Sequence, residues 1–181
     1  MIDARNYAVS ETLRDGTAVT FRAVRPDDKE RIIKAFSQLE PESIYFRLFR
    51  YKSELTDEEL KRVTEVDFSD VVGLVVTVGS GAEETVIASG RYVAYDAPGG
   101  GRRAEVGFVV EEDYQGRGIA SRILKHLAVI ARDHGIAEFE ATVLPENKGM
   151  LAVFSRSGLP MTKRREDDVV SVTLALEEAK P

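Results

Sequence analysis

The order of elements along the 181 residues predicts an α+β fold built around one mixed, mainly antiparallel sheet. Apolar strand patterns dominate from Val71 onward, and a β-hairpin pattern stands near the start of the chain. Apolar residues with helical spacing fall into two blocks, one before Val71 and one over residues 119–131. Strands and helices that follow each other in blocks, rather than in strict alternation, are typical of α+β domains.

The first 70 residues predict a hairpin followed by three short helices. Residues 7–13 and 17–24 flank an Asp-Gly pair, which is a strong turn signal between two strands. Pro26 opens a helical pattern, because proline is tolerated in the first turn of a helix, and a second short helical pattern follows. Thr56 and Glu59 have the spacing of a capping box, which predicts the start of a third helix.

The rest of the chain predicts a strand meander, one long helix, and a final strand–helix–hairpin arrangement. Gly135 follows the long helical pattern and is typical of a residue that ends a helix. The predicted strands cover residues 71–78, 85–94, 103–110, 139–143, 159–165 and 169–176, and the predicted helices cover residues 119–134 and 150–156.

The composition of the chain excludes several classes of function before any motif is considered. The chain has 25 Lys+Arg against 31 Asp+Glu, a net charge of −6, which argues against nucleic acid as a partner. It has no cysteine, which excludes disulfides, thiolate metal sites and a cysteine nucleophile, and its 2 histidines lead us to expect no metal site. Without an apolar signal core or a run of about 20 apolar residues, we expect one cytoplasmic domain over residues 1–181 and no membrane contact.

The loop Gln115-Gly116-Arg117-Gly118-Ile119-Ala120 carries the clearest chemical signal. It lies between an apolar strand pattern that ends at Val110 and the start of the long amphipathic helix. The first N–H groups of a helix have no partner within the helix and lie at its positive end. Glycines let an anion approach these groups closely, so the loop predicts a phosphate cradle to which Arg117 adds positive charge.

Three phosphate-binding patterns can be compared with this loop. The Walker pattern fails, because no Lys-Ser/Thr pair follows the second glycine. The dinucleotide fingerprint fits at Gly116 and Gly118, but its third small position falls on Ser121 and about five residues separate the glycine from Val110. The Gln/Arg-x-x-Gly-x-Gly/Ala pattern of acyl-coenzyme A transferases fits outright. A glycine-rich turn that only caps the helix remains an open alternative.

Together these segments resemble the GNAT N-acetyltransferase superfamily over nearly the whole chain. Residues 21–28 are similar to its opening strand and first helix, and residues 105–120 are similar to its cofactor motif. Asn147, Phe154 and Leu159 resemble a later segment of the family. In that segment Phe154 replaces the usual tyrosine and Leu159 replaces the usual phenylalanine.

The resemblance implies both a fold and a reaction. The fold would be a twisted mixed sheet of about seven strands with helices on both faces. The reaction would be direct attack of a primary amine on acetyl-CoA, with no protein nucleophile. The central parallel strands are expected to splay near Val110, so that the backbone of Phe108, Val109 and Val110 binds the pantetheine arm. A backbone N–H there would polarise the thioester carbonyl.

A narrower resemblance concerns the acceptor. Residues 42–49 and 144–150 are similar to the catalytic domain of bacterial protein lysine acetyltransferases, which implies a protein lysine side chain as acceptor. In some of those proteins the domain is fused to a ligand-sensing or acyl-CoA synthetase-like domain. We expect no room for such a partner domain in 181 residues.

The resemblance also assigns roles to single residues, and each has a simpler alternative. Glu105 would be the general base, or a solvated carboxylate at a strand end. Asn147 would hydrogen-bond the cofactor, cap a helix, or do both. Phe154 would pack in the core or against the cofactor, and it has no hydroxyl with which to protonate the leaving thiolate. Tyr45 and Arg47 would shape the acceptor side, or else pack in a helix and lie in solvent.

Two other functions stay open at this point. One is acetylation of a small amine such as a polyamine, an amino acid or an antibiotic. The other is a non-catalytic acyl-CoA-binding regulatory module, which Phe154 favours and Glu105 opposes. The sequence leaves the oligomeric state open, a homodimer included.

Overall fold

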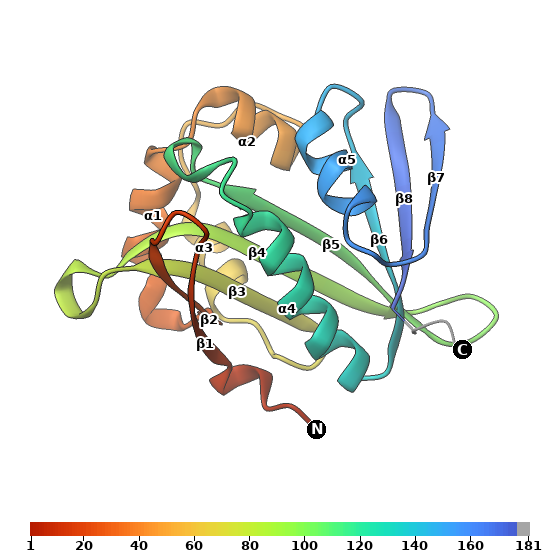
Figure 1. Cartoon of the computed structure of the whole chain (residues 1–181), viewed down its shortest axis with the longest axis horizontal. Helices are drawn as coiled ribbons and strands as arrows, with labels where there is room; N and C mark the ends of the chain where they lie inside the picture. The colour runs from red at the N-terminus through yellow and green to blue at the C-terminus, as the bar shows by residue number, and fades with distance from the viewer. Residues whose placement is uncertain (177–181) are drawn as a thin grey trace.

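The computed structural model describes residues 1–176, which form one eight-stranded sheet with helices on both faces (Figure 1). The strand order is β1-β2-β3-β4-β5-β6-β8-β7, and only β5 and β6 are parallel neighbours. The strands are β1 (Ala8–Thr12), β2 (Ala18–Ala23), β3 (Val71–Val78), β4 (Thr85–Asp96), β5 (Arg102–Val110), β6 (Ile136–Val143), β7 (Met161–Glu166) and β8 (Val169–Ala175). The helices are α1 (Lys29–Ser37), α2 (Pro41–Leu48), α3 (Asp57–Thr64), α4 (Ile119–Asp133) and α5 (Lys148–Ser155).

The prediction of an α+β fold with a mixed, mainly antiparallel sheet is confirmed. The sheet has eight strands where the resemblance implied about seven. α4 is the longest helix of residues 1–176, with 15 residues, and no helix in this range is long and apolar enough to cross a bilayer.

Two glycines show which helix covers which face of the sheet. A Cβ on Gly90 of β4 would come within 2.3 Å of Ile123 Cγ2, so α4 lies against this face and needs a glycine there. The side chain of the next residue, Arg91, lies on the opposite face of the sheet. Gly107 of β5 is the direct partner of Arg91, so a side chain at Gly107 would lie on this second face too. A Cβ on Gly107 would meet Arg47 of α2, so α2 covers this second face.

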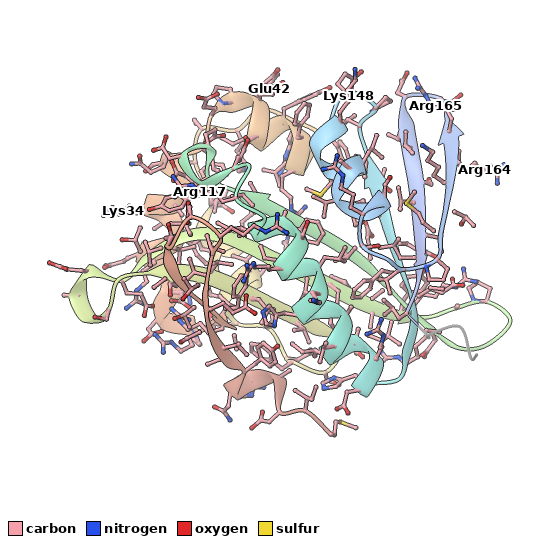
Figure 2. All side chains as sticks on the ribbon, in the orientation of Figure 1. Lys34, Glu42, Arg117, Lys148, Arg164 and Arg165 are labelled. Carbon is pink, nitrogen blue, oxygen red and sulfur yellow. The ribbon has the colours of Figure 1, made fainter. Side chains whose placement is uncertain are left out.

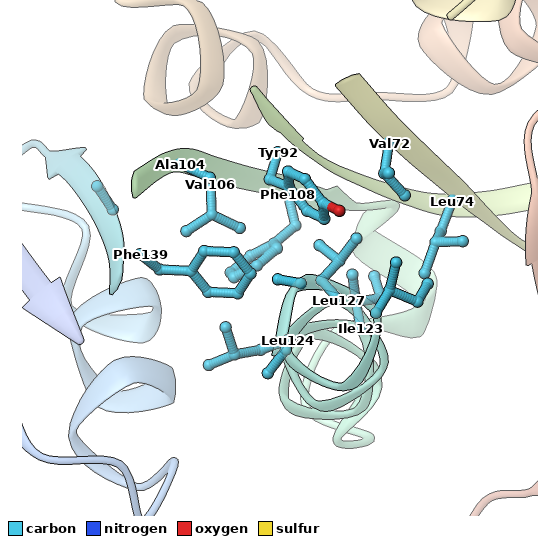
Figure 3. Packing of buried hydrophobic residues seen from close by; sticks show 14 of the residues in the cluster. Val72, Leu74, Tyr92, Ala104, Val106, Phe108, Ile123, Leu124, Leu127 and Phe139 are labelled. Atoms are coloured by element: carbon cyan, nitrogen blue, oxygen red, sulfur yellow. The ribbon is translucent and has the colours of Figure 1, made fainter. Parts of the chain in front are cut away.

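The main core lies between α4 and the middle of the sheet (Figure 3). Leu127 of α4 is fully buried, and Leu124 is 2% exposed. Behind them the rings of Tyr92 and Phe139 pack at a centroid distance of 5.7 Å. Full burial of a large apolar side chain contributes roughly 1.5–3 kcal/mol, so this layer fixes the position of α4 against the sheet.

The N-terminal elements follow the signals in the sequence. β1 and β2 pair from Ala8↔Arg22 to Thr12↔Ala18 around the predicted turn, where Gly16 has a φ of +90°. The capping box of α3 is formed as predicted. The Glu59 N–H donates to Thr56 Oγ1 at 3.2 Å, and the Thr56 N–H donates to the Glu59 carboxylate at 3.1 Å.

A buried ion pair joins β2 to the start of α1. Arg22 Nη2 lies 2.7 Å from Oδ1 of Asp28, whose side chain is fully buried, and Arg22 also pairs with Glu84. The Arg25 N–H donates to the same Asp28 carboxylate at 2.7 Å. Burial by itself raises the pKa of Asp28, but the bonds from Arg22 and Arg25 lower it overall. This carboxylate is therefore ionised in the folded protein and holds the first helix to the sheet.

Candidate active site

The parallel strands β5 and β6 separate halfway along their length. They pair from Arg102↔Ile136 to Glu105↔Glu140, and no pair follows although β5 continues to Val110. On its other side β5 stays paired with β4 along its whole length. The sheet therefore forks, and the β6-facing edge of β5 has no strand partner beyond Glu105.

A cleft of about 670 Å³ opens at this fork. Its walls come from β5, β6, α2, α5 and the loop before α4. Of the residues predicted for the site, the cleft is lined by Arg47, Glu105, Phe108, Val109, Val110, Gln115, Gly116, Gly118, Ile119, Ala120, Asn147 and Phe154.

The glycine-rich loop leaves the N-terminus of α4 free on the cleft side. Gly116 and Gly118 have φ values of +76° and +82°, which glycine adopts without strain. A Cβ on either residue would meet nothing within 4 Å, so the space beside them is open. α4 has no side-chain cap and no acidic residue in its first turn. Its free N–H groups and positive end therefore fit an anion such as a phosphate.

Gln115 fixes the start of this loop. Its Nε2 donates to the Val110 carbonyl at 3.0 Å and lies 3.4 Å from Ser43 Oγ of α2. The loop is thereby tied to the end of β5 and to α2. These bonds use the amide of Gln115, so its contribution to the site is to position the cradle.

Arg117 lies away from the cradle that it was predicted to charge. Its Nη1 is 3.1 Å from the Asp15 carboxylate, and its guanidinium lies 5.0 Å from the centroid of the Tyr114 ring. Asp15 is far from this loop in sequence, so the ion pair became visible only with the fold. In this structure the charge of Arg117 is compensated outside the cleft.

Asn147 and Phe154 lie on the α5 side of the cleft. Asn147 is the N-cap of α5, since its Oδ1 accepts the Met150 N–H at 3.2 Å. The amide nitrogen of Asn147 makes no intramolecular hydrogen bond among residues 1–176, so it can donate to a ligand in the cleft. Phe154 is fully buried and packs on Phe108 with ring centroids 5.7 Å apart. This aromatic pair forms an apolar wall where the strands separate.

Glu105 and Arg47 lie at the other end of the cleft, on the α2 face of the sheet. Glu105 is exposed, and its neighbour two residues along, Gly107, lies under the Arg47 guanidinium. Tyr45 does not reach the cleft. Its ring stacks on Tyr51 with centroids 4.9 Å apart, and it is not among the side chains that line the cleft.

Several residues that line the cleft were missed by the sequence prediction. Arg156 is one of them. Phe49 is another, and its position two residues after Arg47 is a signal in the sequence that could have been used. The other missed residues include Glu40, Glu42, Ser43, Phe46, Glu112, Tyr114, Ser121, Thr142, Glu146, Lys148, Gly149 and Met150, among which Figure 2 labels Glu42 and Lys148.

Comparison with known proteins identifies relatives of this chain. The family model described as an acetyltransferase (GNAT) domain matches residues 18–160. The chain is similar to the acetyltransferase Pat of Mycolicibacterium smegmatis, with 36% identity over 148 residues. This alignment covers 81% of our chain and 42% of Pat, so the chain spans less than half of that relative.

Solved structures agree with this match. The GNAT domain of S. lividans PAT superposes with a TM-score of 0.84 at 37% identity, covering 93% of our chain and 96% of that one. The yncA protein of Salmonella typhimurium, solved with its cofactor acetyl-CoA, superposes with a TM-score of 0.69 at 17% identity and covers 90% and 96%. At that identity the second likeness concerns the fold alone. Because the family match extends over most of the sequence, this chain belongs to the GNAT acetyltransferase family.

Proposed function

We propose that this chain transfers the acetyl group of acetyl-CoA to a primary amine, and that the amine is a lysine side chain of a protein. One observation carries the proposal. The forked β5–β6 pair places an unpaired backbone edge next to an uncapped, glycine-lined helix N-terminus, within one cleft of about 670 Å³. The first feature suits the amide-bearing pantetheine arm and the second suits its pyrophosphate.

The residues of the cleft divide the binding of acetyl-CoA among them. The N–H groups of Gly118, Ile119 and Ala120 would bind the pyrophosphate at the positive end of α4. The free edge of β5 would pair with the pantetheine amides, as a neighbouring strand does. The amide of Asn147 would donate to the same arm. Phe154 and Phe108 would exclude water from the apolar part.

Glu105 is the candidate base for the acceptor. An amine of pKa about 10.4 arrives as an ammonium and must lose a proton before it can attack. Glu105 accepts that proton, directly or through one water. The neutral amine then attacks the thioester carbon of acetyl-CoA, where the C–N bond forms and the C–S bond breaks. The nitrogen gives up its second proton to water as the amide forms, and coenzyme A leaves as a thiolate. A backbone N–H of β5 near Phe108 would stabilise the developing charge on the carbonyl oxygen.

The resemblance of residues 42–49 and 144–150 to the catalytic domain of bacterial protein lysine acetyltransferases supports a protein acceptor. The cleft is also lined by Phe49, which is 43% exposed and which a peptide chain can contact. A small amine would use only the part of the cleft beside Glu105.

The test uses acetyl-CoA labelled in the acetyl group, a set of lysine-containing proteins and peptides, and a matched set of small amines. Release of coenzyme A is followed by a thiol assay, and mass spectrometry locates the acetyl group. We expect release that depends on a protein or peptide and acetyl-lysine on the acceptor. Turnover with small amines alone would contradict the protein acceptor. Binding of acetyl-CoA without turnover on any acceptor would contradict the enzyme and favour a regulatory module.

A further inference from the structure

A second cavity lies on the α2 face of the sheet and joins the cleft. Its volume is about 160 Å³, and its lining is mostly apolar, with Ile32 and Phe36 of α1 among the lining side chains. We call it the side chamber. Arg47, Gly107 and Val109 line both the side chamber and the cleft. The side chamber therefore adjoins the cleft at Arg47 and Gly107, two residues along β5 from Glu105.

Two neighbouring arginines lie at the side chamber, and one of them, Arg47, also lines the cleft. The guanidinium of Arg47 lies over Gly107, because a Cβ on Gly107 would come within 3.1 Å of Arg47 Cζ and 3.3 Å of Nη2. Arg91 of β4 is the direct strand partner of Gly107 and leaves the sheet on the same face. Both arginines line the side chamber. Among residues 1–176, neither makes a side-chain hydrogen bond or an ion pair within 4.0 Å.

The surroundings do not compensate these two charges fully. Burial lowers the pKa of both guanidinium groups, and a neighbouring cation lowers each further, Arg91 for Arg47 and Arg62 for Arg91. Glu105 acts in the opposite direction on both, from beyond ion-pair distance. Glu111 also lines the side chamber but forms no ion pair with either arginine in the described part of the chain. Partly desolvated cations are stabilised when an anion pairs with them, so the pair presents a vacant anion site.

We propose that Arg47 and Arg91 bind a carboxylate carried by the amine acceptor. This inference rests on the proposed function and specifies which amines the site takes. Glu105 and Gly107 are two residues apart on one face of β5, so their Cα atoms are about 7 Å apart, and the Arg47 guanidinium lies over Gly107. An acceptor whose amine reaches Glu105 can therefore place a carboxylate that it carries near the two arginines. A lysine with an acidic neighbour in a peptide meets this requirement, and its hydrocarbon parts can lie against the apolar wall of the side chamber.

The test compares two short peptides with acetyl-CoA as donor. In one, a central lysine is flanked by glutamates, and in the other the glutamates are replaced by glutamines of the same shape. We expect the wild-type kcat/KM to be about tenfold or more higher for the glutamate peptide, since a charge-assisted pair is gained only there. In Arg91→Met the ratio of the two kcat/KM values should fall to about one, and in Arg91→Lys it should be partly retained.

A control variant removes a positive charge elsewhere. Arg164→Met lies on β7, the end strand of the sheet, where its side chain is 81% exposed; Figure 2 shows Arg164 well away from Glu42 of α2. This control should keep the wild-type ratio. Thermal unfolding of each variant checks that the fold is kept. A general loss of turnover affects both peptides equally and therefore does not change the ratio of their kcat/KM values.

Three results would overturn the inference. The first is an equal kcat/KM for the two peptides in the wild type. The second is a preference for the glutamate peptide that survives in Arg91→Met. The third is an Arg91-dependent preference for succinyl-CoA over butyryl-CoA in place of the peptide preference, because the carboxylate would then belong to the acyl donor. Calorimetry measures the affinity of each peptide for the protein saturated with coenzyme A, and so tests carboxylate binding in the absence of catalysis. Tighter binding of the glutamate peptide without turnover would support the carboxylate site while refuting the proposed reaction.

Discussion

Glu105 and Glu140 form the last parallel pair of β5 and β6, and the two carboxylates have different surroundings. Glu140 accepts hydrogen bonds from the Tyr95 hydroxyl at 2.5 Å and from Arg103 Nη1 at 3.2 Å. Glu105 has no such partner among residues 1–176 and lines the cleft. One carboxylate therefore fixes the strands where they are still paired. The other lies unpaired in the cleft at the point where they separate.

The cradle can be tested at Gly118, the residue before α4. Gly118→Asp adds bulk and negative charge where the pyrophosphate would bind. We expect affinity for acetyl-CoA to fall about tenfold or more, which corresponds to about 1.4 kcal/mol, as measured by calorimetry. Gly100→Asp is the matched control, because Gly100 also has a positive φ and open space around it but lies in the β4–β5 turn. Equal affinities of the two variants for acetyl-CoA would mean that the loop only caps the helix and does not bind the pyrophosphate.

The buried pair of Arg22 and Asp28 can be tested by chemical denaturation. Asp28→Asn keeps the shape of the side chain but leaves Arg22 without its buried partner. Breaking a buried pair in this way lowers the free energy of unfolding by about 3–5 kcal/mol. Asp27→Asn is the control, because Asp27 forms an exposed pair with Arg25 and its side chain is 70% exposed. We expect the control to lose about 1 kcal/mol or less, and losses of equal size would show that the buried pair is not special.

His126 of α4 predicts a pH dependence of stability. It is 9% exposed and lies between the Tyr7 hydroxyl at 2.5 Å and the Glu11 carboxylate at 3.0 Å. Burial lowers its pKa, although Glu11 acts in the opposite direction. The unfolded chain therefore binds a proton more readily than the folded one, and stability is lost as pH falls below about 6.5.

The measurement is urea unfolding of the wild type and His126→Gln at about pH 7.5 and about pH 5.5, a window above the range of ordinary carboxylates. The wild type should lose more stability on acidification than the variant does. Comparing the two proteins removes the contribution of every other titrating group. An equal loss in both would mean that Glu11 fully offsets the effect of burial on His126.

Local signals in the sequence predicted much of this fold. The apolar run of β3 gave bounds of Val71–Val78 because turn residues close it at Gly79, and the α3 capping box lies within four residues. The side-chain surroundings of Arg117 and Tyr45 were not predictable in this way. Arg117 pairs with Asp15 only after β1 and β2 are folded beside α4, and the direction of Tyr45 depends on how α2 is rotated over β5. Patterns of spacing identify an element, whereas the partner of an exposed side chain depends on packing between distant segments.

The role of Glu105 as base is tested by Glu105→Gln, which keeps the shape and hydrogen-bonding capacity of the side chain but removes its basicity. We expect kcat to fall by about 10²–10⁴, the usual contribution of a positioned base, while affinity for acetyl-CoA stays the same. Activity should recover in part as pH rises, because more of the amine then arrives without its extra proton. Glu140→Gln is the control, since its carboxylate stands directly opposite on β6 and is held by Tyr95 and Arg103. A wild-type kcat in Glu105→Gln at neutral pH would refute the assignment. A decrease in kcat of the same size in both variants would instead mean that the effect comes from the strand pairing that the two residues share.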